Sequence, residues 1–196
     1  MKNYNYREIL INNTISVIAN EGLDKTTTKA IVSKTDINEA YIYRFFKNKE
    51  DLLAQAFSVL DDELVREAMR SVEVMYIRGA GMETRSRMFF SAMWKFLLGN
   101  KERCLAFVRY YYSQYYQKYS AAEHKERFAK LTEKLSVAFK TGSDTWMLLI
   151  HILNVMLDFA VRIYEGEAEN NEETAEHVFC LLFNSVKPYF KEERSK

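Results

Sequence analysis

Basic and hydroxyl side chains gather in one short stretch of this chain of 196 residues. Between Lys25 and Lys49 there are six Lys and Arg residues and two acids, Asp36 and Glu39, a local excess of four positive charges. The whole chain carries a formal net charge of only +1, so the excess is local. Lysine and arginine bind phosphate oxygens, and a nucleic-acid-binding face needs such an uneven distribution. A solvated surface shows a similar balance fairly often.

Two short helical patterns flank a polar break at residues 35–38, and they are the elements that must position these side chains. Hydrophobic residues resume helical spacing after the break, at Ala40, Ile42, Tyr43 and Phe46. An amphipathic helix is also predicted just before Gly22. Three such helices would form a small head with a helix-turn-helix, whose second helix enters the major groove of DNA.

Residues 9–53 resemble the amino-terminal DNA-binding domain of TetR-family transcriptional repressors. The positions that carry this resemblance are Gly22, Thr27, Ile31, Ile37, Tyr43, Phe46, Lys49 and Leu52. The segment YRFFKNKEDLL is close to the family's hallmark of Tyr, two residues on, Phe, then Lys and an apolar residue. Beyond residue 53 the resemblance rests on helical character and length alone. It implies an all-α fold of about nine helices, with a DNA-binding domain at 1–47 and a helical effector-binding and dimerisation domain at 48–196.

The resemblance implies that five residues contact DNA phosphates: Thr27, Thr28, Tyr43, Lys47 and Lys49. Plain capping of the second helix is the alternative for the threonines, and packing of the ring inside the head is the alternative for Tyr43. Lys49 stands in the first turn of a helix that Asn48 is predicted to cap, where a cation opposes the helix dipole. A DNA phosphate would compensate for this conflict.

The resemblance also implies that five residues on or beside the recognition helix face base edges: Asn38, Glu39, Ala40, Tyr41 and Arg44. Arg44 could pair with guanine, Glu39 could accept from cytosine N4, and Tyr41 could stack on a thymine methyl group. The sequence departs from the family pattern at Asp36, where glycine is usual. It departs again near the start of the recognition helix, where the family often has a small residue.

Aromatic residues dominate two of the helices predicted after the head. The predicted helices cover about 49–76, 84–98, 101–119, 120–140, 145–164 and 174–188. Members of the resembled family bind a small effector in the carboxy-terminal domain, so the chain is expected to hold a largely apolar or aromatic molecule. The predicted pocket residues are Trp94, Phe107, Tyr111, Tyr115, His151, Asn154 and Asp158. The alternative for the aromatic members is a core with partly exposed tyrosines.

A polar stripe on the predicted helix at 145–164 contains His151, Asn154, Asp158 and Arg162. It could contact a ligand or fix the register of a dimer interface, and a solvent-facing stripe with an Asp158–Arg162 pair is at least as good an account. The last two helices offer more apolar surface than one subunit needs. In the resembled family they form a four-helix dimer interface, which predicts a homodimer.

Several other classes of protein find little support. No P-loop is present, and no Glu precedes a His by three residues, as a di-iron bundle requires. Cys104 and Cys180 are expected to be buried reduced thiols. We therefore expect no enzyme, no catalytic residues, no metal and no cofactor.

The longest apolar tract, 146–161, is interrupted by polar residues and is expected to fall short of a membrane span. No secretory signal opens the chain, so the expected location is the cytoplasm, without a membrane partner.

The sequence thus predicts a DNA-binding transcriptional repressor, a homodimer released from double-stranded operator DNA by a small-molecule effector. The alternative is a helical ligand-binding or interaction protein without DNA function. In that alternative, residues 26–53 form an ordinary three-helix core.

Overall fold

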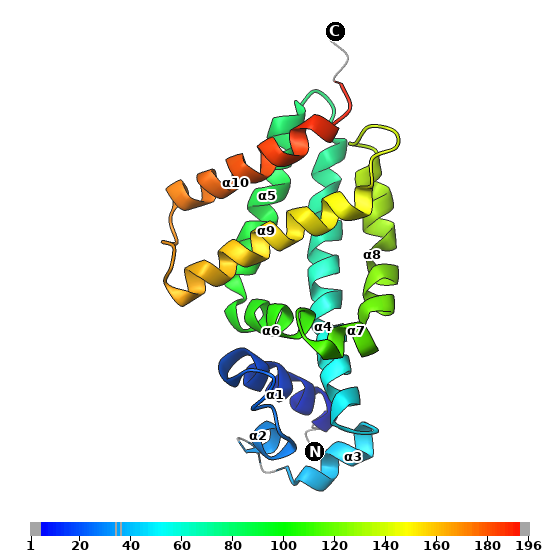
Figure 1. The fold of residues 1–196 in the computed structure, drawn as a ribbon, viewed down its shortest axis with the longest axis vertical. Helices are drawn as coiled ribbons and strands as arrows, with labels where there is room; N and C mark the ends of the chain where they lie inside the picture. The colour runs from blue at the N-terminus through cyan, green and yellow to red at the C-terminus, as the bar shows by residue number, and fades with distance from the viewer. Residues whose placement is uncertain (1–4, 34, 36, 193–196) are drawn as a thin grey trace. The chain divides into compact units, whose positions relative to one another are not determined.

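The computed structural model describes residues 5–33, 35 and 37–192, and in that part of the chain it is helical without a β-strand. The α-helices are α1 (Tyr6–Glu21), α2 (Thr28–Val32), α3 (Ile42–Phe45), α4 (Lys49–Ser71), α5 (Met82–Gly99), α6 (Lys101–Tyr111), α7 (Gln114–Tyr119), α8 (Ala121–Ser136), α9 (Thr145–Glu165) and α10 (Glu172–Val186) (Figure 1). Three 3-10 helices accompany them: η1 (Glu39–Tyr41), η2 (Val72–Tyr76) and η3 (Lys187–Tyr189). The predicted all-α class is confirmed, with ten α-helices described where about nine were expected.

The chain divides into two compact units. Unit 1 comprises Met1–Glu63 and Lys101–Glu126, and unit 2 comprises Leu64–Asn100 and Arg127–Lys196. Helices α4 and α8 each contribute residues to both units. The boundary of the DNA-binding domain after residue 47 stays a prediction, because compactness does not test where DNA contacts end.

In unit 1, α1 packs against α2, α3 and α6. Its buried face is Leu10, Ile11, Ile15 and Ile18, which recur at helical spacing. The helix ends at Gly22, which adopts φ +87° and donates its N–H to the Ile18 carbonyl at 3.1 Å. The helix-ending glycine predicted from the sequence is therefore confirmed.

The predicted single helix over 101–119 is wrong, because the structure breaks it at Ser113. That residue is extended, with φ −92° and ψ 162°, and its hydroxyl donates to the Tyr110 carbonyl at 2.6 Å. Tyr110 and Tyr116 are both buried in unit 1. On one straight helix, residues six apart point about 120° away from each other. The turn between α6 and α7 lets both rings enter the same core.

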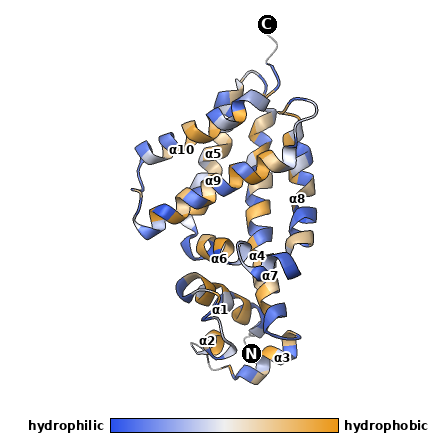
Figure 2. Cartoon of the chain, in the orientation of Figure 1, coloured by the Kyte–Doolittle hydropathy of each residue, from blue (hydrophilic) through white to orange (hydrophobic). Residues whose placement is uncertain are grey.

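In unit 2, α5 packs against η2, α9 and α10, and α9 packs against α10. Helix α9 is long and apolar enough to cross a membrane by length and composition alone, so the expectation that this tract falls short of a span is wrong on that criterion. Leu149, Met156 and Ala160 are nevertheless fully buried in unit 2. Hydrophilic residues interrupt the apolar surface of α9 (Figure 2), and α9 is a core helix of this unit.

The two cysteines differ, although both were expected to be buried. Cys104 is buried in α6, and this burial raises the pKa of its thiol to about 12. Cys180 is exposed on α10, so the expectation for it is wrong. Its thiol donates to Glu176 Oε1 at 3.4 Å, and that hydrogen bond raises its pKa above the ordinary value.

One thiol per chain is therefore expected to react with Ellman's reagent in the folded protein at pH 8, because only an accessible thiolate attacks a disulfide. The fast thiol is Cys180, and its rate should rise with pH as more of it ionises. Absorbance of the released thiolate measures the count, and Cys180→Ser should remove the fast phase. Two fast thiols in the folded protein would contradict the burial of Cys104.

Candidate nucleic-acid interface and ligand cavity

The two threonines predicted to contact phosphate lie at the start of α2. Thr27 is its N-cap, and the Thr27 hydroxyl accepts the N–H of Ala30 at 3.1 Å. The Thr28 hydroxyl donates to Glu39 Oε2 at 2.6 Å. This bond joins α2 to η1, so it brings together one predicted phosphate contact and one predicted base contact. Capping explains Thr27 locally, and a phosphate role for either residue stays a prediction.

The predicted recognition segment starts as the 3-10 helix η1 and continues as α3. Asn38 caps it, since the Asn38 side chain accepts the N–H of Ala40 at 3.0 Å. Ile42 and Phe46 are buried and anchor the segment in unit 1. Asp36, the predicted departure at the turn, and Lys34, one of the six basic residues, lie outside the described residues.

Exposed side chains line the outer face of this anchored segment. Tyr43 is 60% exposed, so its ring does not fill the interior of the head. Arg44 and Lys47 are also exposed. The Arg44 guanidinium lies 4.3 Å from the centroid of the Tyr41 ring, a cation–π contact between two predicted base-reading residues. Donors for both bases and phosphates are therefore accessible on one short element.

Reciprocal hydrogen bonds fix the start of α4. Asn48 Oδ1 accepts the N–H of Asp51 at 2.8 Å, and Asp51 Oδ2 accepts the N–H of Lys47, also at 2.8 Å. Burial alone raises the Asp51 pKa, but hydrogen bonds from Gln55 and from the Lys47 backbone bring it below the ordinary value. An ionised Asp51 thus complements the α4 dipole next to Lys49. The cap predicted at Asn48 is confirmed. The negative charge of Asp51 partly offsets the unfavourable interaction between Lys49 and the helix dipole, even without a DNA phosphate.

The predicted pocket residues of α6 and α7 belong to unit 1. Phe107 and Tyr111 stack with ring centroids 5.8 Å apart, and both rings lie near His124, at 6.4 and 5.5 Å. Tyr115 instead stacks with Tyr119 at 6.5 Å. Phe107 and Tyr111 are thus brought together in an aromatic cluster, from which Tyr115 points elsewhere.

A buried contact between a histidine and an aspartate lies in this cluster. His124 Nδ1 lies 2.8 Å from Asp61 Oδ1, with Asp61 fully buried and His124 4% exposed. Tyr116 completes the surroundings, with its ring 5.6 Å from the imidazole. Burial first, and then Tyr111 and Asp61, raise the pKa of Tyr116 well above its ordinary value. No sequence pattern linked Asp61 to His124, because 63 positions separate them.

The other four predicted pocket residues belong to unit 2. Trp94 is buried and stacks with Phe90 at 5.4 Å. His151 and Asp158 are exposed, and His151 Nε2 lies 2.8 Å from the Ser185 hydroxyl. Asp158 accepts a hydrogen bond from Arg162 at 2.9 Å, so this end of the polar stripe matches the solvent-facing alternative. Asn154 is half-buried.

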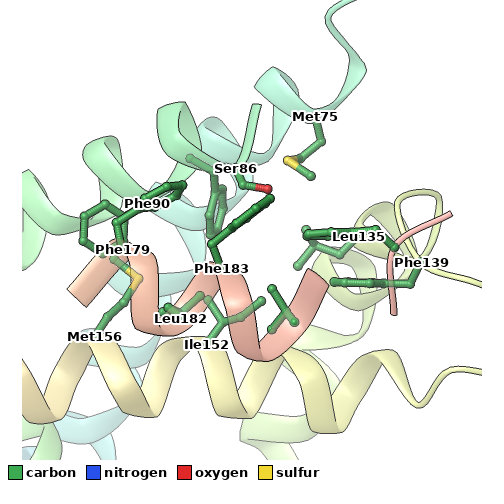
Figure 3. Close-up of a pocket in the computed structure, with 13 residues that line it drawn as sticks. Met75, Ser86, Phe90, Leu135, Phe139, Ile152, Met156, Phe179, Leu182 and Phe183 are labelled. Carbon is green, nitrogen blue, oxygen red and sulfur yellow. The ribbon is translucent and has the colours of Figure 1, made fainter. Parts of the chain in front are cut away.

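Unit 2 contains a cavity of about 30 Å³, and none of the seven predicted pocket residues lines it. Its thirteen lining residues come from η2, α5, α8, α9 and α10 and from the segments at Phe139 and Phe190. Twelve of them are hydrophobic, and Ser86 is the thirteenth (Figure 3). Along their helices, the lining residues are spaced as ordinary core residues are. The sequence pattern therefore predicts that they are buried but does not predict a cavity between them.

Comparison with known proteins identifies the amino-terminal region. Residues 10–56 match the family of bacterial regulatory proteins known as the tetR family. No curated protein matches the sequence.

Solved structures share the fold across nearly the whole chain. A TetR family transcription regulator from Marinobacter aquaeolei VT8 is 18% identical with a TM-score of 0.73, and the match covers 91% of this chain and 94% of that one. The fatty acid degradation regulator FadR from Bacillus halodurans is 16% identical with a TM-score of 0.63, covering 93% and 96%. The multidrug binding protein EbrR, complexed with imidazole, is 14% identical with a TM-score of 0.62, covering 90% and 93%.

Proposed function

We propose that this chain, whose residues 10–56 match the tetR family of bacterial regulatory proteins, is a DNA-binding transcriptional repressor. A small molecule releases it from operator DNA. The observation that carries the DNA part is the recognition segment. Ile42 and Phe46 hold it by burial, while Tyr43, Arg44 and Lys47 are exposed on it. A rigid element that presents donors outward fits the major groove. Such a regulator works in the cytoplasm, where the DNA is.

The five predicted phosphate contacts and the five predicted base contacts are part of this proposal. Phosphate contacts fix the orientation of the protein on the duplex, and base contacts supply specificity. The Thr28–Glu39 hydrogen bond and the Arg44–Tyr41 stacking support it, because both hold a donor or acceptor in place before DNA arrives. A preorganised side chain loses less conformational entropy on binding.

A homodimer through α9 and α10 also belongs to the proposal. Met147 on α9 is 59% exposed and Leu181 on α10 is 61% exposed, so each helix leaves a large apolar side chain in water in a single chain. A second copy would cover both. Two heads related by a two-fold axis could then read the two halves of a palindromic operator.

We place the effector in this apolar cavity of unit 2, which the ligand would enlarge on binding. The seven residues predicted from the sequence remain a second proposal for ligand contacts. Met75, which lines the cavity, belongs to η2, and η2 directly continues α4. Arg85 donates to the Met75 carbonyl at 2.9 Å, and the Tyr76 hydroxyl donates to the Lys134 carbonyl at 2.9 Å. These bonds hold η2 to α5 and to α8.

A ligand that moves η2 would therefore act on the end of the helix that begins at Lys49. The effector shifts the population only if it binds the released form more tightly than the DNA-bound form. If filling the cavity displaces the end of this helix, the ligand binds the displaced and the undisplaced arrangements with different affinities.

Lys49→Ala is expected to weaken binding to DNA roughly uniformly across sequences, because a phosphate contact carries no base information. It should also reduce the slope of log affinity against log salt concentration by about one. Fluorescence anisotropy of labelled duplexes at several salt concentrations measures both.

Lys95→Ala, at an exposed lysine of α5, is the matched control and should leave the salt slope unchanged. An unchanged slope in Lys49→Ala as well would remove Lys49 from the phosphate contacts. An intact protein without salt-sensitive DNA binding would defeat the proposed function.

A further inference from the structure

The cavity of unit 2 is chemically uniform except at one atom. Six of its lining residues are phenylalanines, and several of their rings touch, such as Phe90 with Phe179 at 5.5 Å and Phe139 with Phe190 at 5.2 Å. No lining residue carries a charge. An aromatic ring that enters such a site gains offset or edge contacts with these rings. A charged group would lose its hydration without receiving a counter-charge.

Ser86 provides the exception. Its hydroxyl oxygen is buried and has no hydrogen-bond partner among the described residues. A serine inside a helix can donate to the carbonyl four residues before it or point to solvent. Figure 3 shows the Ser86 hydroxyl directed toward the space between Met75 and Phe183. A buried donor without a partner is costly, so an acceptor on a ligand would recover a bond that the protein itself does not make.

The cavity is small but its lining is adaptable. About 30 Å³ is room for one or two waters and not for an aromatic ring. Met75 and Met156 both line it, and methionine side chains are unbranched and change rotamer easily. Met75 sits in η2, outside the long helices, so its movement disturbs the least regular part of the lining.

Resting on the proposed effector site, we infer that the cavity takes an uncharged aromatic molecule with a single hydrogen-bond acceptor. The Ser86 hydroxyl donates to that acceptor, and the Met75 side chain moves aside to make room. Ser86 thus selects among apolar ligands, and Met75 is the first residue of η2 to respond to them.

Three probes of similar size test the inference: acetophenone, ethylbenzene and benzoate. The readout is the fluorescence of Trp94, which stacks on the cavity residue Phe90, in a Trp146→Phe background and without DNA. Acetophenone should bind roughly 2- to 10-fold more tightly than ethylbenzene, the ratio that one net hydrogen bond supports. Benzoate should not bind measurably. Ser86→Ala should bring the ratio of acetophenone to ethylbenzene close to one.

Ser71→Ala is the matched control for Ser86→Ala, and Met93→Ala is the matched control for Met75→Ala. Ser71→Ala removes another buried hydroxyl that lacks a partner in the described part of the chain, but Ser71 does not line the cavity, so the ratio should stay. Met75→Ala should tighten binding of both neutral probes by enlarging the cavity. Met93→Ala, at a buried methionine of α5 outside the cavity, should not.

Benzoate binding as tight as that of acetophenone would overturn the inference, as would an unchanged ratio in Ser86→Ala or the absence of any response to acetophenone. An unaltered affinity in Met75→Ala would overturn the role of Met75. Failure of the proposed function looks different. A protein that binds acetophenone as described but never binds DNA keeps the inference, whereas operator release by benzoate alone keeps the proposed function.

Discussion

Replacing Asp61 by alanine is expected to lower the free energy of unfolding by about 1–3 kcal/mol, the cost of leaving the buried imidazole of His124 without its hydrogen-bond partner. Asp61 is fully buried, and its carboxylate lies 2.8 Å from Nδ1 of the buried His124. The rings of Phe57 and Tyr116 lie 6.2 and 5.6 Å from the imidazole, so water cannot readily replace the lost carboxylate. Urea unfolding followed by circular dichroism measures the change.

The neighbouring acid gives a control for this prediction. Asp62→Ala removes an exposed carboxylate from the next position of α4 and should change stability by less than about 0.5 kcal/mol. Equal losses for the two variants would mean that the Asp61–His124 contact contributes little. The contact joins α4 to α8 inside unit 1. A large decrease in the free energy of unfolding would show that this contact makes a main contribution to the stability of that unit.

Arg44→Ala is expected to reduce affinity for a preferred operator by roughly 5- to 150-fold, the effect of losing one bidentate contact with guanine. The preferred operator is obtained by selection from random duplex DNA. Because Arg44 is exposed and stacked on Tyr41, the substitution removes the proposed base-reading group without opening the core. Selection repeated with the variant should show relaxed preference at one base pair in each half-site.

The contrast with Lys49→Ala makes the Arg44 prediction decisive. A base contact lowers affinity for the preferred operator much more than for random DNA, whereas a phosphate contact lowers both alike. Arg44→Lys keeps the charge but loses the planar fork, so it should retain general DNA binding and lose most of the preference. An equal loss on all sequences would move Arg44 from the base contacts to the phosphate contacts.

Features that depend on a few neighbouring residues could be predicted from the sequence. The cap at Asn48 and the helix-ending Gly22 are formed by groups within four positions of one another. The tetR-family resemblance also lies in one continuous stretch. Local hydrogen bonds and local spacing determine such features, so a single sequence is enough to find them.

Features that depend on packing could not be read in this way. No glycine or proline marks the break at Ser113 in the sequence. The break forms because Tyr110 and Tyr116 share one core. Cys180 follows an apolar pattern and is nevertheless exposed. The predicted pocket joined residues that the structure assigns to different units, because aromatic density was the only signal available.

By itself, the sequence determined the all-α class, the helix cap at Asn48 and the helix-ending Gly22. Those properties arise from hydrogen bonds and periodicity along the chain. Only the tertiary structure decided that Asp61 meets His124 and that the Ser86 hydroxyl faces a cavity without a partner in the described residues. A void is set by how well side chains from several distant segments fill a shared space, and no one of those segments contains that information.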